Sequence, residues 1–262
     1  MILEGIVASL FYCAVTLQTP DDPTFPPPLP GRPHSSIENF FDSHFSSRAW
    51  RENVWEDYLT EPPVLLPVTL AAGAAAVSPW DRRWERHFHG DWGDRTSIGN
   101  ASAGTVIAGS ILVGCFDPAP GRTPWDEIFV EGESYAIAAG TTTALKVLVR
   151  RHRPGSAGQR GSFPSSHAAL AFTAASLIER DEGLGLGLPA YGLAGVTALS
   201  RVEVGQHFPS DVLAGAAIGV LTAEVMDALH FGTGRRGRGI AGPQLTLDVG
   251  PRESALGLAF RY

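Results

Sequence analysis

The sequence predicts an all-α protein, a bundle of six helices with a short C-terminal β-hairpin. Six apolar segments rich in Ala, Gly, Leu and Val lack the alternation of a half-buried strand and are long enough for helices. Turn and capping residues separate them, such as Pro79 and Pro118 after two segments and Ser165 before a third. Small residues along the segments favour close helix packing. The expected helices are Val64–Val77, Ala101–Phe116, Tyr135–Val149, His167–Ile178, Leu188–Ser200 and Val212–Leu229.

Four regions are expected along the chain. Residues 1–19 hold a short apolar run that suits the core of a signal peptide. Residues 20–62 form a Pro-rich linker followed by short N-terminal helices, and residues 63–232 form the helical domain. Residues 233–262 are a Gly/Arg-rich loop and a tail in which apolar and polar residues alternate, as in a β-hairpin.

The export signal predicts a periplasmic or otherwise exported protein that associates with a membrane surface. An integral membrane protein is the alternative. Most uninterrupted apolar runs are about 14 to 16 residues long, whereas a membrane-spanning helix needs about 20. One run also carries Lys146.

The charge of the chain is negative overall and positive in one segment. The formal net charge of −7 disfavours nucleic acid as a partner. Between Lys146 and Arg160, however, there are five Lys or Arg residues and no acidic residue. A local basic cluster in an acidic protein indicates a small anionic ligand, although a solvated basic face is the usual explanation for a charge run taken alone.

Three motifs carry the chemistry. In the first, Lys146 is followed after six residues by Arg153-Pro154. On a helix, residues i and i+7 share a face, so Lys146 and Arg153 are expected to point at one site. A point charge and a planar guanidinium together suit a phosphate group. Alone, the pair equally fits cations that complement a helix end.

The second motif is Pro164-Ser165-Ser166-His167 at the start of an expected helix. Ser165 and Ser166 can cap free N–H groups, and the same groups can bind an anion. His167 lies in the first turn, where it could give a proton to a leaving oxygen. A structural histidine is the alternative.

The third motif is Ser200-Arg201, then His207 and Asp211 at spacings of five and three residues. Pro209 favours a helix start close to Phe208, which places Asp211 within one turn of His207. A carboxylate bonded to one ring nitrogen would free the other as a nucleophile. A capping Asp and a surface His are the alternative.

In order and spacing, the three motifs resemble those of the type 2 phosphatidic acid phosphatase superfamily, which includes bacterial acid phosphatases, lipid phosphate phosphatases and vanadium haloperoxidases. The family pattern has Gly where this chain has Ser166. The resemblance implies a helical bundle of the acid phosphatase and vanadium haloperoxidase type. It covers the region from Lys146 to Asp211 and the helices around it.

The resemblance also implies a metal-independent phosphatase with no cofactor, for which vanadate is an inhibitor. His207 would attack phosphorus to give a phosphohistidine, Asp211 would orient it, and His167 would protonate the leaving group. The remaining family positions would bind phosphate: Lys146, Arg153, Ser165, Ser166 and Arg201. The substrate would be a small phosphomonoester or a lipid or isoprenoid phosphate or diphosphate.

Two other functions remain open at this point. One is a haloperoxidase that uses vanadate as its cofactor, and the other is a non-catalytic envelope protein that binds anionic lipid. The partnership of His167, His207 and Asp211 disfavours the second, because binding alone requires none of them. The sequence leaves the oligomeric state open.

Overall fold

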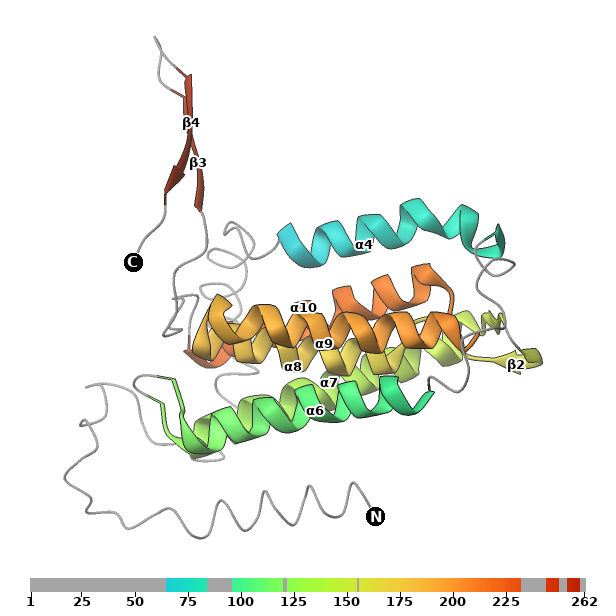
Figure 1. Ribbon diagram of the computed structural model, residues 1–262, viewed down its shortest axis with the longest axis horizontal. Helices are drawn as coiled ribbons and strands as arrows, with labels where there is room; N and C mark the ends of the chain where they lie inside the picture. The colour runs from blue at the N-terminus through green and yellow to red at the C-terminus, as the bar shows by residue number, and fades with distance from the viewer. Residues whose placement is uncertain are drawn as a thin grey trace.

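The computed structural model describes residues 65–83, 96–119, 122–154, 156–231, 244–249 and 254–259 (Figure 1). The expected signal peptide, the Pro-rich linker and the N-terminal helices lie outside these residues. Element labels follow Figure 1. The order is α4 (Leu65–Val77), η4 (Ser78–Trp80), α6 (Thr96–Phe116), α7 (Pro124–Val149), β1 (His152–Arg153), β2 (Ser156–Arg160), α8 (Ser166–Glu182), α9 (Leu184–Glu203), α10 (Pro209–Phe231), β3 (Gln244–Val249) and β4 (Ser254–Ala259).

The six expected helices and the C-terminal hairpin are all present, which confirms the predicted fold class. Strands β3 and β4 pair in antiparallel order, with Gln244 opposite Ala259 and Val249 opposite Ser254. A second antiparallel hairpin, β1–β2, follows α7 and was not predicted from the sequence.

Helix α7 is longer than the sequence pattern indicated, because it begins at Pro124 rather than near Tyr135. Thr123 caps it in a reciprocal capping box with Asp126, and Pro124 occupies the first turn. Four acidic residues in the first three turns interrupt the apolar pattern. The helix therefore has 26 residues, enough to cross a membrane.

Helix α8 is the centre of the bundle and contacts α6, α7, α9 and α10, while α4 packs on α10 (Figure 1). Helices α8 and α10 approach closely at two glycines of α10. A Cβ at Gly215 would collide with the carbonyl oxygen of Ser165, and one at Gly219 with the backbone of Ala169 and Thr173. Backbone cannot move aside as a flexible side chain can, so these glycines fix the separation of the two helices.

Charged side chains are buried at the end of the bundle where α7 begins and α8 ends. Arg122 lies 3.2 Å from both Glu127 and Asp181 and 2.7 Å from Asp227. Arg180 pairs with Asp227 and with Glu224. These bonds join the turn before α7 to α7, α8 and α10. Removing one partner would leave a buried charge uncompensated.

The outer surface of the helices carries few charges. Within the bounds of the six α-helices, no Asp, Glu, Lys or Arg is exposed, although several are half-buried. Large apolar side chains are exposed there instead, including Leu148 (76%), Phe116 (69%) and Leu188 (64%). Among the described residues, the exposed charged side chains lie between the helices, at Arg82, Arg83, Asp117, Arg150 and Arg160. Two helices, α6 and α10, are long and apolar enough to cross a membrane.

The close approach of α8 and α10 leads to a stability prediction. We expect Gly219→Ala to destabilise the fold by about 1–3 kcal/mol, because the added methyl group overpacks backbone. Gly192→Ala in α9 is the matched control, since a Cβ there meets nothing within 4 Å. It should be neutral or slightly stabilising. Thermal unfolding of both variants in detergent measures the difference, and equal melting temperatures would contradict the prediction.

Candidate active site

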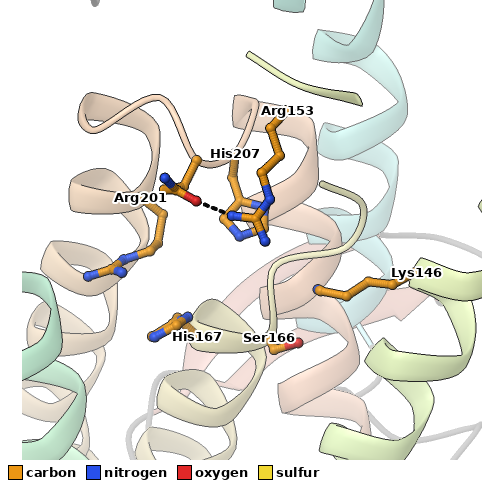
Figure 2. A pocket seen from close by; sticks show the side chains of 7 residues that line it. Lys146, Arg153, Ser166, His167, Arg201 and His207 are labelled. Carbon is orange, nitrogen blue, oxygen red and sulfur yellow. Dashed lines mark hydrogen bonds between the residues drawn. The ribbon is translucent and has the colours of Figure 1, made fainter. Parts of the chain in front are cut away.

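A small cavity lies at the end of the bundle where α7 and α9 end and where α8 and α10 begin. Its volume is about 170 Å³. That is below the roughly 300–1,000 Å³ of pockets that enclose a drug-sized ligand, and it suits a compact group such as phosphate. Its lining residues are Lys146, Arg153, Ser166, His167, Arg201, Gln206 and His207. Figure 2 shows Arg201 and Lys146 on opposite sides, with the two histidines between them.

Six of the eight residues singled out from the sequence therefore line one cavity. The other two, Ser165 and Asp211, are fully buried beside it. The hydroxyl of Ser165 accepts a hydrogen bond from the N–H of Ala168 at 3.4 Å and caps α8. Ser166, the first residue of α8, bonds through its hydroxyl to Thr142 at 3.0 Å. The N–H groups of this first helical turn have no carbonyl of their own helix to bond, which favours an anion there.

Lys146 and Arg153 reach one site, as expected from the sequence, but they do not share a helix face. Helix α7 ends at Val149, and Arg150 takes a left-handed conformation with φ of 50°. Such a residue terminates a helix. The chain then enters the β1–β2 hairpin, so Arg153 reaches the cavity from a strand. Its guanidinium donates to Oε1 of Gln206, while the Lys146 ammonium donates to the carbonyl oxygen of Pro164.

Arg201 reaches the cavity from the last turn of α9 and is held by the start of α6. Its Nη2 donates to the carbonyl oxygen of Thr96 at 3.1 Å and to Oδ1 of Asn100 at 3.0 Å. A Cβ at Gly99 would collide with this guanidinium and with Ser200. The absence of a side chain at Gly99 therefore allows α6 to pass beside Arg201.

His207 lies in the turn between α9 and α10, directly before the helix start that Pro209 predicts. Its Nδ1 is 2.6 Å from the carbonyl oxygen of Ser162. A carbonyl only accepts hydrogen bonds, so Nδ1 carries the proton and Nε2 of the neutral ring has a free lone pair. Because the ring lines the cavity, this tautomer is the one that a nucleophile requires.

The expectation that Asp211 bonds directly to the His207 ring is wrong. The nearest carboxylate oxygen is 3.9 Å from Nδ1, beyond hydrogen-bond distance. Asp211 instead accepts bonds from the N–H of Phe208 at 2.9 Å, from Nη1 of Arg151 at 2.6 Å and from the Ser162 hydroxyl. The main-chain carbonyl of Ser162 fixes the tautomer, and the Asp211 carboxylate holds Ser162.

The charge around His207 favours the neutral ring. Burial lowers the pKa of the imidazole below its usual 6.5, and the Lys146 ammonium lowers it further, while Asp211 and the Ser162 carbonyl act in the opposite direction. The net shift is downward, so His207 is unprotonated at neutral pH.

Four residues of this site escaped the sequence analysis. Gln206 lines the cavity, Ser162 holds His207, and Arg151 and Asp81 form an ion pair of 2.6 Å beside Asp211. Arg151 belonged to the basic cluster noted from the sequence, which did not distinguish its role from that of its neighbours. Asp81 carried no signal, because it lies 70 residues from Arg151 in the chain.

A metal centre has no ready set of ligands in the described part of the chain. Among those residues, no group of three or more His, Cys, Asp or Glu side chains could hold a metal ion. The positive charge at the cavity comes from Lys146, Arg153 and Arg201.

The described helices thus bring three cations, two imidazoles and a helix N-terminus to one cavity, an arrangement that can bind a phosphate group. Comparison with known families agrees. Residues 131–233 match the PAP2 superfamily model, and this segment contains all three motifs. The resemblance to the type 2 phosphatidic acid phosphatase superfamily is thereby confirmed.

Curated relatives include phosphatases of two kinds. The chain is 29% identical to the lipid A 1-phosphatase of Porphyromonas gingivalis over 160 residues, 60% of this chain and 36% of that protein. It is 36% identical to the decaprenylphosphoryl-5-phosphoribose phosphatase of Mycobacterium tuberculosis over 117 residues, 42% of this chain and 64% of that protein. The chain thus spans less than two thirds of either relative.

Two solved structures match part of this chain. Aquifex aeolicus LpxE matches 50% of this chain and 81% of its own, with a TM-score of 0.42 and 22% identity. The transmembrane PAP2-type phosphatidylglycerolphosphate phosphatase of Bacillus subtilis matches 63% of this chain and 94% of its own, with a TM-score of 0.47 and 22% identity.

The cavity leads to a prediction about ligand protection. Lys146 is the only lysine of the chain, so an amine-reactive reagent such as acetic anhydride can modify one side chain. We expect inorganic phosphate or vanadate to slow this modification, because a bound oxyanion would occupy the amine. Peptide mass spectrometry measures the rate, and the chain N-terminus serves as the internal control. Equal rates with and without phosphate would contradict the role of Lys146.

Proposed function

We propose that the chain is a metal-independent phosphatase that acts on a phosphate ester or diphosphate carried by a lipid or isoprenoid tail. The observation that carries the proposal is the His207 geometry. Its Nδ1 proton is fixed on a main-chain carbonyl, and the ring lines a cavity with three cations. Binding alone would not require a ring held in its nucleophilic tautomer.

The proposed reaction has two steps, each of which these side chains can support. Nε2 of His207 attacks phosphorus, and the bond from phosphorus to the ester oxygen breaks. Lys146, Arg153 and Arg201 stabilise the charge on the equatorial oxygens, the work that divalent metals do in other phosphoryl-transfer enzymes. Water then displaces His207 from phosphorus and releases inorganic phosphate.

His167 is the proposed acid for the leaving oxygen and the base for the attacking water. It lies in the first turn of α8 and lines the same cavity as His207. The cations around it, Arg201, Lys146 and Arg153, oppose a positive charge on its ring. A bound phosphate supplies the negative charge that offsets them, so this role depends on the substrate.

The surface of the bundle supports a membrane location and hence a lipid substrate. A protein in water keeps charges on its surface, whereas these helices expose large apolar side chains and keep their charged side chains buried or half-buried. We propose that the bundle is embedded in a membrane, the alternative to the surface-associated protein first expected. The cavity would then lie at one membrane face, with the phosphate inside and an apolar tail beside the helices. The curated relatives, a lipid A 1-phosphatase and a decaprenylphosphoryl-5-phosphoribose phosphatase, are named for substrates of this class, which supports the proposal.

The first test is the release of phosphate by the purified protein in detergent, with a chelator present. The panel contains phosphatidate, an isoprenoid diphosphate, a lipid A phosphate and a nucleotide. We expect His207→Ala to abolish release from every substrate that the parent chain hydrolyses, because the other imidazole at the cavity, His167, has the separate role of acid and base. Normal hydrolysis by this variant would exclude the mechanism, and full inhibition by the chelator would exclude metal independence.

The second test is the pH dependence of kcat/KM. Since the pKa of His207 lies below 6.5, the ring stays neutral and nucleophilic until the pH falls past that lowered pKa. We therefore expect the acid limb of the profile to lie below pH 6.5. An acid limb above pH 6.5 would contradict the environment described for this ring.

A further inference from the structure

In the sequence, Arg151 lies between Lys146 and Arg153, which both line the cavity. The side chain of Arg151 points elsewhere. It is not one of the residues that line the cavity. Its side chain, 26% exposed, extends to the start of α10 and to the residue after η4. The guanidinium also covers the ring of Phe208, at 4.2 Å from its centroid.

The guanidinium joins two buried carboxylates. Nη1 is 2.6 Å from Oδ1 of Asp211 and 2.8 Å from Oγ of Ser210, and Nη2 is 2.6 Å from Oδ2 of Asp81. Asp81 in turn accepts a bond from the N–H of Ser210 at 3.2 Å. The two carboxylates are 0% and 1% exposed. One shared cation therefore faces two buried carboxylates.

The main chain of Arg151 acts on the same part of the site. Its carbonyl oxygen accepts from the N–H of Gly161 at 2.9 Å and from the N–H of Ser162 at 3.0 Å. Ser162 is the residue whose carbonyl fixes the His207 tautomer and whose hydroxyl bonds Asp211. The main chain of Arg151 therefore holds Ser162 and its side chain holds Asp211, the two residues that position the His207 imidazole.

We propose that Arg151, with Asp81 as its anchor, is a positioning residue for the His207 nucleophile and sets how strongly the Asp211 carboxylate acts on that ring. The proposal rests on the proposed phosphatase function. Arg151 contacts neither the cavity nor the phosphate, and it acts through Asp211 and Ser162.

The proposal predicts the direction in which each substitution changes the pKa of His207. The charged groups around His207 come from every neighbouring element: Lys146, Arg153, His167, Arg201 and Asp211. Of these, Asp211 alone is negative and favours a protonated imidazole. Removing the charge of Arg151 leaves Asp211 uncompensated and raises the pKa of His207. Removing the charge of Asp81 lowers the pKa of His207, because the positive charge of Arg151 is then offset by Asp211 alone.

The experiment compares Arg151→Gln, Asp81→Asn and Arg150→Gln in the full chain. Arg150→Gln is the matched control, since it removes the same charge at the exposed neighbouring position. We expect Arg151→Gln to lower kcat by about 100-fold through misplacement of the nucleophile, with KM unchanged. The acid limb of its kcat/KM profile should move to higher pH. In Asp81→Asn this limb should move to lower pH, and in Arg150→Gln it should stay where it is in the parent chain.

A second measurement is independent of turnover. Diethyl pyrocarbonate modifies neutral imidazole, so the pH dependence of His207 modification, followed by peptide mass spectrometry, reports the protonation of the ring directly. The pH dependence of modification should shift to higher pH in Arg151→Gln and to lower pH in Asp81→Asn. An inactive parent chain would refute the proposed function, and the modification profile would still decide the role of Arg151. Profiles of Arg151→Gln and Asp81→Asn that match the control would overturn the proposal. If Arg151→Gln fails to fold, the test is whether the pH dependence of His207 modification shifts to lower pH in Asp81→Asn.

Discussion

The site depends on one buried carboxylate, that of Asp211. Its side chain holds the Ser162 hydroxyl, the N–H of Phe208 and the Arg151 guanidinium. Its main-chain oxygen accepts from the N–H of Ser165 at 3.0 Å. Asp211 therefore joins the first turn of α10 to the first turn of α8 and to the segment that carries Ser162. Because Lys146, Arg153 and Arg201 reach the same cavity from three other segments, the nucleophile keeps a fixed place among them only while these bonds persist.

The bundle reverses the usual distribution of polarity, since its helices expose large apolar side chains while their charged side chains are buried or half-buried. At one end, charged side chains form the proposed active site. At the other, Arg122 and Arg180 pair with carboxylates and join α7, α8 and α10. In an apolar environment, water is not available to replace the partners of these charged groups. Polar bonds therefore hold each end of the bundle, and packing of alanine-rich helices holds its middle.

Sequence periodicity was sufficient for the helices and for six of the lining residues, because each motif is local. It predicted the end of α7 at Val149 but not its start at Pro124, which four acidic residues hid. It also failed where tertiary contacts decide the outcome. The bond from His207 to Ser162 spans 45 residues and that from Arg151 to Asp81 spans 70, and no local pattern encodes either.

The cations around the cavity have a consequence for the proposed reaction. The first turn of α8 and three cations face one small volume, so their positive charges repel one another. Any oxyanion relieves that repulsion, whether or not it carries a leaving group. Inorganic phosphate should therefore be retained after hydrolysis and compete with the next substrate. Turnover in such a protein would be governed by product release, and local phosphate concentration would set its rate.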